Sequence, residues 1–529
     1  MTWLHLGELV QINAEKAPNK LAFKDAKRSL TFREFNLRTN KLANGLLSRG
    51  LKKGDKIAVL ANNCLEFAEI YIAAAKAGLI IVPLNFRLLP EDLYWIVQNA
   101  ECKMVMIEQR YYQTTLDNWD LVVEFGLDIL QSVVIGDIPI GDGWSYFEDI
   151  VGAGSEDCPE ISIDPEDTWI LLYTSGTTGK PKGVVRSHRS YIAFFLINAA
   201  EYSFTPKDYG LVLMPLSHVN STFYAFVFTY IGAACYIHRE YNFDPEELLQ
   251  IFAQEKITFT SLIPTHYNLI LNLSDEIKTK YDLSSVTKLL TSSAPATKEM
   301  KRGVMELFKG VELFEAYGST EAGLVTILRP EDQFAKAGSI GQECFGSDKI
   351  RILDPVTRQP TPEGEIGELF SRSPMQLTDY YNLPNKTREA MDGSFFSAGD
   401  MARRDSDGYY YLVDRKANMI ISGGEHIFPS EVEKAITTHP SVIECAVVGL
   451  NHPKWGEAVT AVCILASGRS PSESLAENLR DFCYERLARF KVPKKVLFIG
   501  YEEMPRTGSG KVIHRVLRER FNAEIDWND

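Results

Sequence analysis

The sequence predicts an α/β protein with two unequal domains. Apolar runs of strand length alternate with helical patterns up to about Gly323, and this alternation is typical of sheets built from βαβ units. After Ala335 the sequence pattern changes to short segments of alternating apolar and polar residues, separated by Gly, Pro, Asp and Asn. This pattern indicates a β-rich subdomain. The length of 529 residues exceeds what one hydrophobic core usually supports. We therefore predict a large N-terminal domain over residues 1–413, with its β-rich part at about 335–413, and a small C-terminal α/β domain over residues 414–529.

The first βαβ unit lies near the N-terminus. Residues 30–49 repeat apolar side chains at helical spacing after Thr31, a residue suited to cap a helix. Residues 56–61 then predict a buried strand, residues 67–76 a helix and residues 79–83 a second strand. Because a helix links the two strands, we expect them to pair in parallel.

The same alternation returns between residues 169 and 323. It predicts strands at 170–174, 210–215, 257–263 and 288–293, and helices at 190–200, 245–255 and 298–308. The β-rich part contributes strands at 349–353, 367–372 and 408–414. The C-terminal domain contributes a helix after Pro429, strands at 445–450 and 458–465, and a helix over 474–489.

Charge and composition exclude several classes of protein. The formal net charge of -14 argues against non-specific binding to nucleic acid or to an anionic membrane. The N-terminus has no secretory pattern, and the longest apolar run, Phe223–Ile237, is shorter than the roughly 20 residues of a membrane span. We read that run as a buried helix leading into a strand. The eight cysteines are scattered without metal-ligand spacing, so we expect reduced thiols in a cytoplasmic protein with no integral membrane segment.

The strongest local motif is YTSGTTGKPKG, at residues 173–183, directly after a predicted strand. Its three glycines allow the backbone to approach a ligand, and its hydroxyl and ammonium groups suit a polyphosphate. Pro181 follows the Gly-Lys pair where the Walker motif has Ser or Thr, so this is a different phosphate loop. A flexible polar surface loop is the alternative.

This segment resembles the phosphate-binding loop of the adenylate-forming superfamily, which includes acyl- and aryl-CoA synthetases, peptide-synthetase adenylation domains and firefly-type luciferases. Further motifs follow in the family's order as far as Lys511, so the resemblance covers essentially the whole chain. It implies that the substrates include ATP with Mg²⁺. The residues that the resemblance places on the phosphates are Thr174, Ser175, Gly176, Thr177, Thr178, Gly179, Lys180 and Lys182.

The YGSTE segment, residues 317–321, offers an aromatic face, two hydroxyls and a carboxylate. The resemblance implies that Tyr317, beside Gly318 and Ser319, stacks on adenine, that Thr320 bonds near the α-phosphate and that Glu321 holds Mg²⁺. A solvated carboxylate would be the ordinary reading of Glu321 alone. Upstream, the segment Ser293, Ala294 and Pro295 is similar to the family's adenine-contacting strand end, with a polar turn as its alternative.

Two further residues are suited to the ribose and the phosphate. Asp400 lies in FFSAGD and Arg415 in YLVDRKANMI. The resemblance implies that Asp400 accepts from the ribose hydroxyls and that Arg415 contacts ribose or phosphate. Ala398 stands where the family usually has Thr, a mild departure.

Lys511, in PRTGSGKVIHR, matches the family's catalytic lysine. A carboxylate that attacks the α-phosphate meets like-charge repulsion, and an ammonium that bridges both partners relieves it. A lysine near a C-terminus is otherwise usually only solvated. His218, in PLSHVNS, is similar to the residue that closes the family's acyl pocket, and a core histidine is its alternative.

The remaining motifs resemble the coenzyme A half of the family's site. Gly423 and Gly424 match the glycine loop that lines the pantetheine tunnel, and Trp455 resembles a CoA-contacting position. The resemblance implies a small, mobile C-terminal domain that rotates between two half-reactions. Ala417 stands at the hinge where Asp or Lys is usual, and His426 stands where Asn is common.

The sequence therefore predicts an AMP-forming carboxylate–CoA ligase with the substrates ATP, coenzyme A and a small carboxylate. The apolar segments expected around the acyl group favour an aromatic, alicyclic or short-to-medium-chain monocarboxylate. An enzyme that charges a carrier protein, a luciferase-like oxygenase and a non-catalytic nucleotide-binding regulator are the alternatives. We expect no nucleic-acid partner, and a homodimer is left open.

Overall fold

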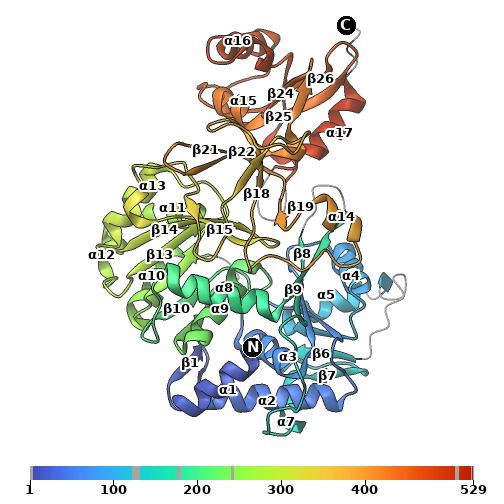
Figure 1. The fold of residues 1–529 in the computed structure, drawn as a ribbon, viewed down its shortest axis with the longest axis vertical. Helices are drawn as coiled ribbons and strands as arrows, with labels where there is room; N and C mark the ends of the chain where they lie inside the picture. The colour runs from blue at the N-terminus through green and yellow to red at the C-terminus, as the bar shows by residue number, and fades with distance from the viewer. Residues whose placement is uncertain are drawn as a thin grey trace. The chain divides into compact units, whose positions relative to one another are not determined.

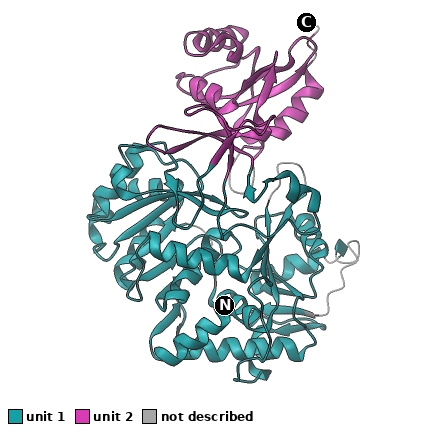
Figure 2. Cartoon of the chain, viewed as in Figure 1, with its two compact units in different colours: residues 1–350, 371–398 teal, residues 351–370, 399–529 magenta. Residues whose placement is uncertain are grey.

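The computed structural model describes residues 4–118, 120–121, 131–174, 180–239, 243–506, 512–525 and 527. The chain divides into two compact units, one of residues 1–350 and 371–398 and the other of residues 351–370 and 399–529 (Figure 2). Much of the β-rich segment is thus grouped with the C-terminal residues. The boundary predicted at residues 413–414 separates the large domain from the C-terminal domain that is expected to rotate. It stays a prediction.

The first unit contains a seven-stranded sheet in the order β7-β6-β5-β3-β4-β8-β9. Figure 1 labels its strands β6, β7, β8 and β9. The strands pair in parallel except β9, which runs antiparallel to β8. The predicted βαβ unit of β3, α3 and β4 is confirmed. The strands are β3 (Lys56–Leu60), β4 (Ile80–Pro83), β5 (Met104–Glu108), β6 (Gln131–Ile135), β7 (Trp144–Tyr146), β8 (Thr168–Thr174) and β9 (Lys182–Ser187). The helices of this part are α2 (Phe32–Ser48), α3 (Leu65–Ala77), α4 (Pro90–Asn99), α5 (Tyr112–Asp117) and α7 (Phe147–Ala153).

A nine-stranded sheet in the order β16-β15-β14-β13-β12-β10-β11-β1-β2 completes the first unit. Its six strands from β14 to β1 are parallel, and the strands at both edges are antiparallel. The strands are β1 (Leu21–Lys24), β2 (Ser29–Thr31), β10 (Tyr209–Val212), β11 (Ala234–Ile237), β12 (Phe259–Leu262), β13 (Lys288–Ser292), β14 (Glu312–Ser319), β15 (Gly323–Leu328) and β16 (Gln342–Glu343). The helices are α1 (Leu6–Lys16), α8 (His188–Glu201), α9 (Val219–Ile231), α10 (Pro245–Glu255), α11 (Pro264–Leu271), α12 (Asp275–Lys280), α13 (Lys298–Leu307) and α14 (Pro384–Glu389), and a short hairpin joins β19 (Met391–Asp392) to β20 (Phe395–Phe396).

Local sequence explains several element ends. The Thr31 hydroxyl accepts from the Glu34 N–H, and the Glu34 carboxylate accepts from the Thr31 N–H, which closes a capping box at the start of α2. The apolar run at 223–237 is a buried helix followed by strand β11, as predicted. Gly232 separates the two elements with φ of 71°, a left-handed conformation that favours glycine.

The second unit contains two sheets. The first is antiparallel, in the order β17 (Arg351–Leu353), β18 (Gly367–Phe370), β21 (Asp400–Arg404) and β22 (Tyr410–Arg415). The second has the order β24-β23-β26-β25, with β27 beside β26. Its elements are β23 (Ile420–Ser422), β24 (Glu425–Ile427), β25 (Val442–His452), β26 (Gly456–Leu465), β27 (Lys495–Phe498), α15 (Pro429–Ile436), α16 (Glu473–Tyr484) and α17 (His514–Glu524).

The helix predicted over residues 474–489 was too long, because α16 ends at Tyr484. Leu487, just beyond it, packs against the hydrophobic core of the second unit, and a short 3₁₀ turn follows at Arg489–Lys491. All eight cysteines are free thiols. No helix among the described residues has both the length and the apolar character needed to cross a membrane.

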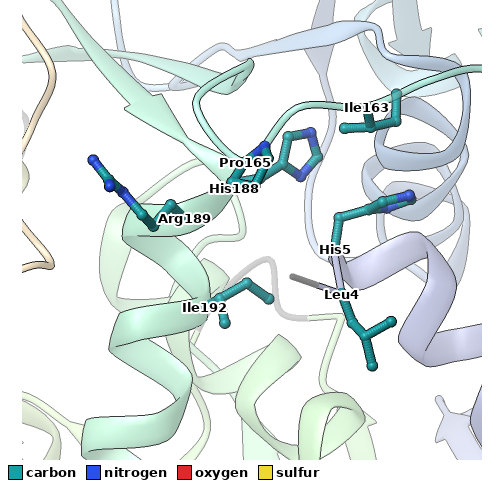
Figure 3. Close-up of a pocket in the computed structure, with 7 residues that line it drawn as sticks. All are labelled: Leu4, His5, Ile163, Pro165, His188, Arg189 and Ile192. Atoms are coloured by element: carbon teal, nitrogen blue, oxygen red, sulfur yellow. The ribbon is translucent and has the colours of Figure 1, made fainter. Parts of the chain in front are cut away.

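A small hollow in the first unit is lined by two histidines and mostly apolar neighbours (Figure 3): Leu4, His5, Ile163, Pro165, His188, Arg189 and Ile192. The two imidazole rings meet edge to face with centroids 5.7 Å apart. His188 also stacks on the buried Trp169 at 5.8 Å. Burial lowers the pKa of His188 to about 3, because the charged imidazole loses its water. The fold therefore holds this histidine in its neutral form.

We expect the free energy of unfolding to decrease as the pH falls below about 6.5. The unfolded His188 binds a proton near its ordinary pKa of about 6.5, whereas the folded one resists protonation until about pH 3. The contribution is therefore complete above pH 6.5 and decreases by up to about 1.4 kcal/mol per pH unit below it. Urea unfolding at several pH values measures this slope, and His188→Phe should reduce it while keeping a ring on Trp169. His426→Phe, at an exposed position, is the control and should leave the slope unchanged.

Candidate active site

The described ends of the phosphate-loop motif lie on β8 and β9, which pair antiparallel. Thr174 and Lys182 face each other across the two strands, and the predicted residues Ser175, Gly176, Thr177, Thr178 and Gly179 between them lie outside the described residues. The Lys180 ammonium lies 5.4 Å from the centre of the Trp95 ring. The strand predicted before the motif is confirmed. The antiparallel strand after it, which begins at Lys182, was not predicted.

The YGSTE motif ends strand β14 and continues into the turn of a tight hairpin. Its first three residues, Tyr317, Gly318 and Ser319, belong to β14, which pairs with β15. A side chain at Gly318 would place a Cβ atom 2.2 Å from the carbonyl oxygen of Gly323, so the close approach of the strands requires glycine there. The turn leaves Thr320 and Glu321 at the tip of the hairpin.

A buried arginine on strand β9 donates a hydrogen bond to this tip. Arg186, on β9, donates through Nη1 to the carbonyl of Thr320 at 2.6 Å and through Nη2 to the carbonyl of Met375 at 2.7 Å. Its guanidinium lies 5.0 Å from the Tyr191 ring centre, and burial lowers its pKa. Sequence analysis missed Arg186. Its partners, the carbonyls of Thr320 and Met375, lie far along the chain, and no pattern around Arg186 indicates them.

Glu321 is partly buried, and its environment suits a magnesium ligand. The Tyr380 hydroxyl donates to its Oε1 atom at 2.9 Å, and the described residues supply no donor to Oε2. No cluster of three or more His, Cys, Asp or Glu side chains that could hold a metal ion occurs in the described parts of the chain. One carboxylate with an open oxygen fits Mg²⁺, which proteins often bind through one or two carboxylates together with substrate phosphates.

The carboxyl ends of the parallel strands gather the other predicted residues of this unit at one sheet edge. Tyr317 lies near the end of β14. Ser293, Ala294 and Pro295 follow β13, and His218 follows β10. Ligands of open α/β sheets commonly bind at this edge.

His218 is exposed and caps α9, and its Nδ1 atom accepts a long bond of 3.4 Å from the Asn220 N–H. The alternative of a core histidine is therefore wrong. The side-chain amide of Asn220 donates to Ser261 Oγ at 3.0 Å and to Ser292 Oγ at 3.1 Å. These bonds connect the start of α9 to the ends of β12 and β13.

The second unit carries the remaining predictions. Asp400 is buried and lies opposite Arg415 in the β21–β22 ladder, with Oδ1 at 2.8 Å from the arginine Nε. Arg415 is thus already paired with the carboxylate that is predicted to hold ribose. Lys511 lies outside the described residues.

The glycine loop joins β23 to β24. Gly423 and Gly424 have φ of 61° and 89°, so both adopt a backbone conformation that favours glycine. The Gly423 N–H donates to the Trp455 carbonyl at 2.8 Å, and Trp455 is partly exposed beside the loop. The structure therefore brings these three predicted residues together.

Comparison with known proteins places the chain in a family. Residues 10–381 match the model of the AMP-binding enzyme family, and residues 431–511 match that of the AMP-binding enzyme C-terminal domain. The chain belongs to the AMP-binding enzyme family. In this AMP-binding enzyme the first matched range begins within α1 and the second ends at Lys511, so the recognition made from its motifs is confirmed.

Relatives extend over the full chain. It is 32% identical over 520 residues to a feruloyl-CoA synthase of Amycolatopsis sp, which covers 98% of this chain and 99% of the relative. It is 30% identical over 527 residues to the long-chain-fatty-acid–CoA ligase FadD13 of Mycobacterium tuberculosis, again covering 98% and 99%. The crystal structure of ATP-bound MatB from Rhodopseudomonas palustris superposes with a TM-score of 0.83 at 28% identity, covering 99% of this chain and 100% of that one. The predicted two-domain α/β fold is confirmed, whereas the roles of individual residues stay predictions.

Proposed function

We propose that this AMP-binding enzyme is an AMP-forming carboxylate–CoA ligase. A carboxylic acid and ATP give acyl-AMP and pyrophosphate, and the thiol of coenzyme A then displaces AMP to give the acyl-CoA. The observation that carries this proposal is the packing of the Thr320–Glu321 tip against β9, the strand that leads out of the phosphate-loop hairpin. Phosphate-binding and metal-binding groups thus come from two motifs of one unit.

In the first half-reaction we assign the phosphates to residues 174–180 and Lys182, adenine to Tyr317 and the segment 293–295, and ribose to Asp400. Bound Mg²⁺ supplies charge neutralisation on the phosphates, with Glu321 as its protein ligand. We assign to the Lys511 ammonium the role of bridging the attacking carboxylate and the α-phosphate, where its charge would offset their repulsion. Thr320 donates to the α-phosphate region, and His218 borders the reacting acyl group.

In the second half-reaction we assign the pantetheine path to Gly423 and Gly424 and a CoA contact to Trp455. The C-terminal domain, residues 414–529, rotates between the two steps. Ala417 lies in a short 3₁₀ turn between β22 and β23, which is consistent with a hinge. Alanine has the φ/ψ freedom that such a rotation requires.

We infer that the acid is a compact monocarboxylate: aromatic, alicyclic or of short to medium chain length. Helices α8 and α9 run side by side (Figure 1), and between them Phe194 and Phe223 are buried and stacked with centroids 3.5 Å apart. Packed rings at this interface favour a compact acyl group over a long flexible chain. The names of the two relatives differ on this point, since one contains an aromatic acyl group and the other a long aliphatic one.

The negative net charge of -14 supports an enzyme of small molecules without a nucleic-acid partner. We also propose a cytoplasmic location, in line with the scattered cysteines. A homodimer remains open in the proposal.

A pyrophosphate-exchange screen tests the proposal. The protein is incubated with ATP, Mg²⁺ and labelled pyrophosphate over a panel of carboxylic acids, and positive acids are repeated with coenzyme A and with a pantetheinylated carrier protein. We expect exchange with compact monocarboxylates and thioester formation on coenzyme A. Transfer to the carrier alone would identify a charging enzyme, and no exchange with any acid would favour a nucleotide-binding regulator.

A further inference from the structure

We propose that Tyr380 is a positioning residue that orients the Glu321 carboxylate toward the metal-bound phosphates. This inference rests on the proposed function and extends it to a residue that no motif indicated. The Tyr380 hydroxyl donates to Oε1 of Glu321 at 2.9 Å, from 59 positions further along the chain. Tyr380 itself is 4% exposed, so this bond is sheltered from competing water.

The main chain around Tyr380 is fixed to both ATP-binding motifs. Residues 375–381, which we call the strap, follow β9 through bonds from Thr378 N–H to Val185 O at 3.0 Å and from Tyr381 N–H to Gly183 O at 2.8 Å. On the other side, the Leu377 N–H donates to the carbonyl of Glu321 at 2.6 Å. The strap therefore joins the strand after the phosphate loop to the tip of the Tyr317–Glu321 hairpin.

The ring of Tyr380 makes a second contact, with Lys182. The Lys182 ammonium lies 4.3 Å from its centroid, within the range of a cation–π interaction. One aromatic side chain thus contacts a predicted phosphate ligand with its face and the predicted metal ligand with its hydroxyl. A change in the position of Tyr380 would move both groups together.

The bond to Oε1 has a directional consequence. A carboxylate rotates readily about its terminal torsion, which is broad. A hydroxyl that binds Oε1 selects one orientation and leaves Oε2 for a cation. The phenol donates to a charged acceptor, and such bonds are the stronger class. Tyr380 acts through Glu321, so its loss should weaken binding of the metal–nucleotide complex without abolishing the chemistry.

The test compares Tyr380→Phe with Tyr381→Phe. The neighbouring Tyr381 also donates its hydroxyl to a glutamate, the exposed Glu101, at 3.4 Å, so both variants remove one phenolic oxygen from the same strap. Calorimetric titration measures binding of ATP to the full chain without any acid, once with Mg²⁺ and once with EDTA. We expect Tyr380→Phe to weaken binding of MgATP about tenfold and to leave binding of metal-free ATP unchanged. Tyr381→Phe should match the wild type in both titrations.

A double-mutant cycle separates positioning from a fold defect. In the Glu321→Gln background, Tyr380→Phe should cause no further loss of MgATP affinity, because the carboxylate that it orients is gone. Equal losses with and without Mg²⁺, additive losses in the cycle, or wild-type MgATP affinity in Tyr380→Phe would each overturn the role of Tyr380. Wild-type protein that fails to bind MgATP would instead refute the proposed function, and the positioning role with it.

Discussion

Lys511→Ala should strongly reduce acyl-AMP synthesis while the variant still converts supplied acyl-AMP and coenzyme A to thioester. Only the first step brings an anionic carboxylate to an anionic phosphate, so only that step needs a cation between the two. Removal of one such electrostatic group typically reduces kcat about 10²- to 10³-fold. Pyrophosphate exchange measures the first half-reaction, and thioester formation from synthetic acyl-AMP measures the second.

Lys434→Ala is the matched control, because Lys434 is an exposed lysine on α15 of the same unit. It should leave both half-reactions unchanged. Near wild-type exchange in Lys511→Ala would show that the assignment of Lys511 is wrong. Equal losses in both half-reactions would point to a defect in the whole C-terminal domain.

The sequence predicted most elements of the fold because their signals are local. Helix α10 begins and ends at the predicted residues, since Asp244 caps it, Pro245 occupies its first turn and its apolar side chains repeat at helical spacing. The parallel strands were visible as apolar runs buried on both faces. The errors arose where tertiary packing decides, as at Leu487, which draws the chain into the core after Tyr484.

The residues of the candidate site also fall into those with a local sequence signal and those without one. Contiguous motifs such as Tyr317–Glu321 carry their chemistry within a few letters. Arg186 and Tyr380 instead contact this motif from 134 and 59 positions away, and neither has a local signature that distinguishes it from an ordinary core residue. The nearest available signal was the position of Arg186, a charged residue directly after Val184 and Val185. A buried charge in such a place requires partners, which is a reason to look for a site.

Arg186→Met should reduce kcat/KM for adenylation about 10²-fold and also lower the stability of the protein. The substitution removes the donors to the buried Met375 carbonyl and to the part-buried Thr320 carbonyl, and an unpaired buried acceptor costs about 1–3 kcal/mol. The tip that carries Glu321 then loses this link to β9, while the bonds from Leu377 and Tyr380 to Glu321 remain. Urea unfolding and acid-dependent pyrophosphate exchange measure the two effects.

Arg186→Lys separates charge from geometry at this position. A lysine keeps the positive charge near the tip, but its single ammonium lacks the planar fork that reaches both carbonyls at 2.6 and 2.7 Å. If the two bonds position the tip, Arg186→Lys should remain well below the wild type in adenylation. Recovery to nearly wild-type rates would instead assign the effect to the buried charge. Arg189→Met is the control, because Arg189 is an exposed arginine at the start of α8 that pairs with Glu166, and it should alter neither measurement. Adenylation by Arg186→Met at the wild-type rate would contradict a positioning role for Arg186.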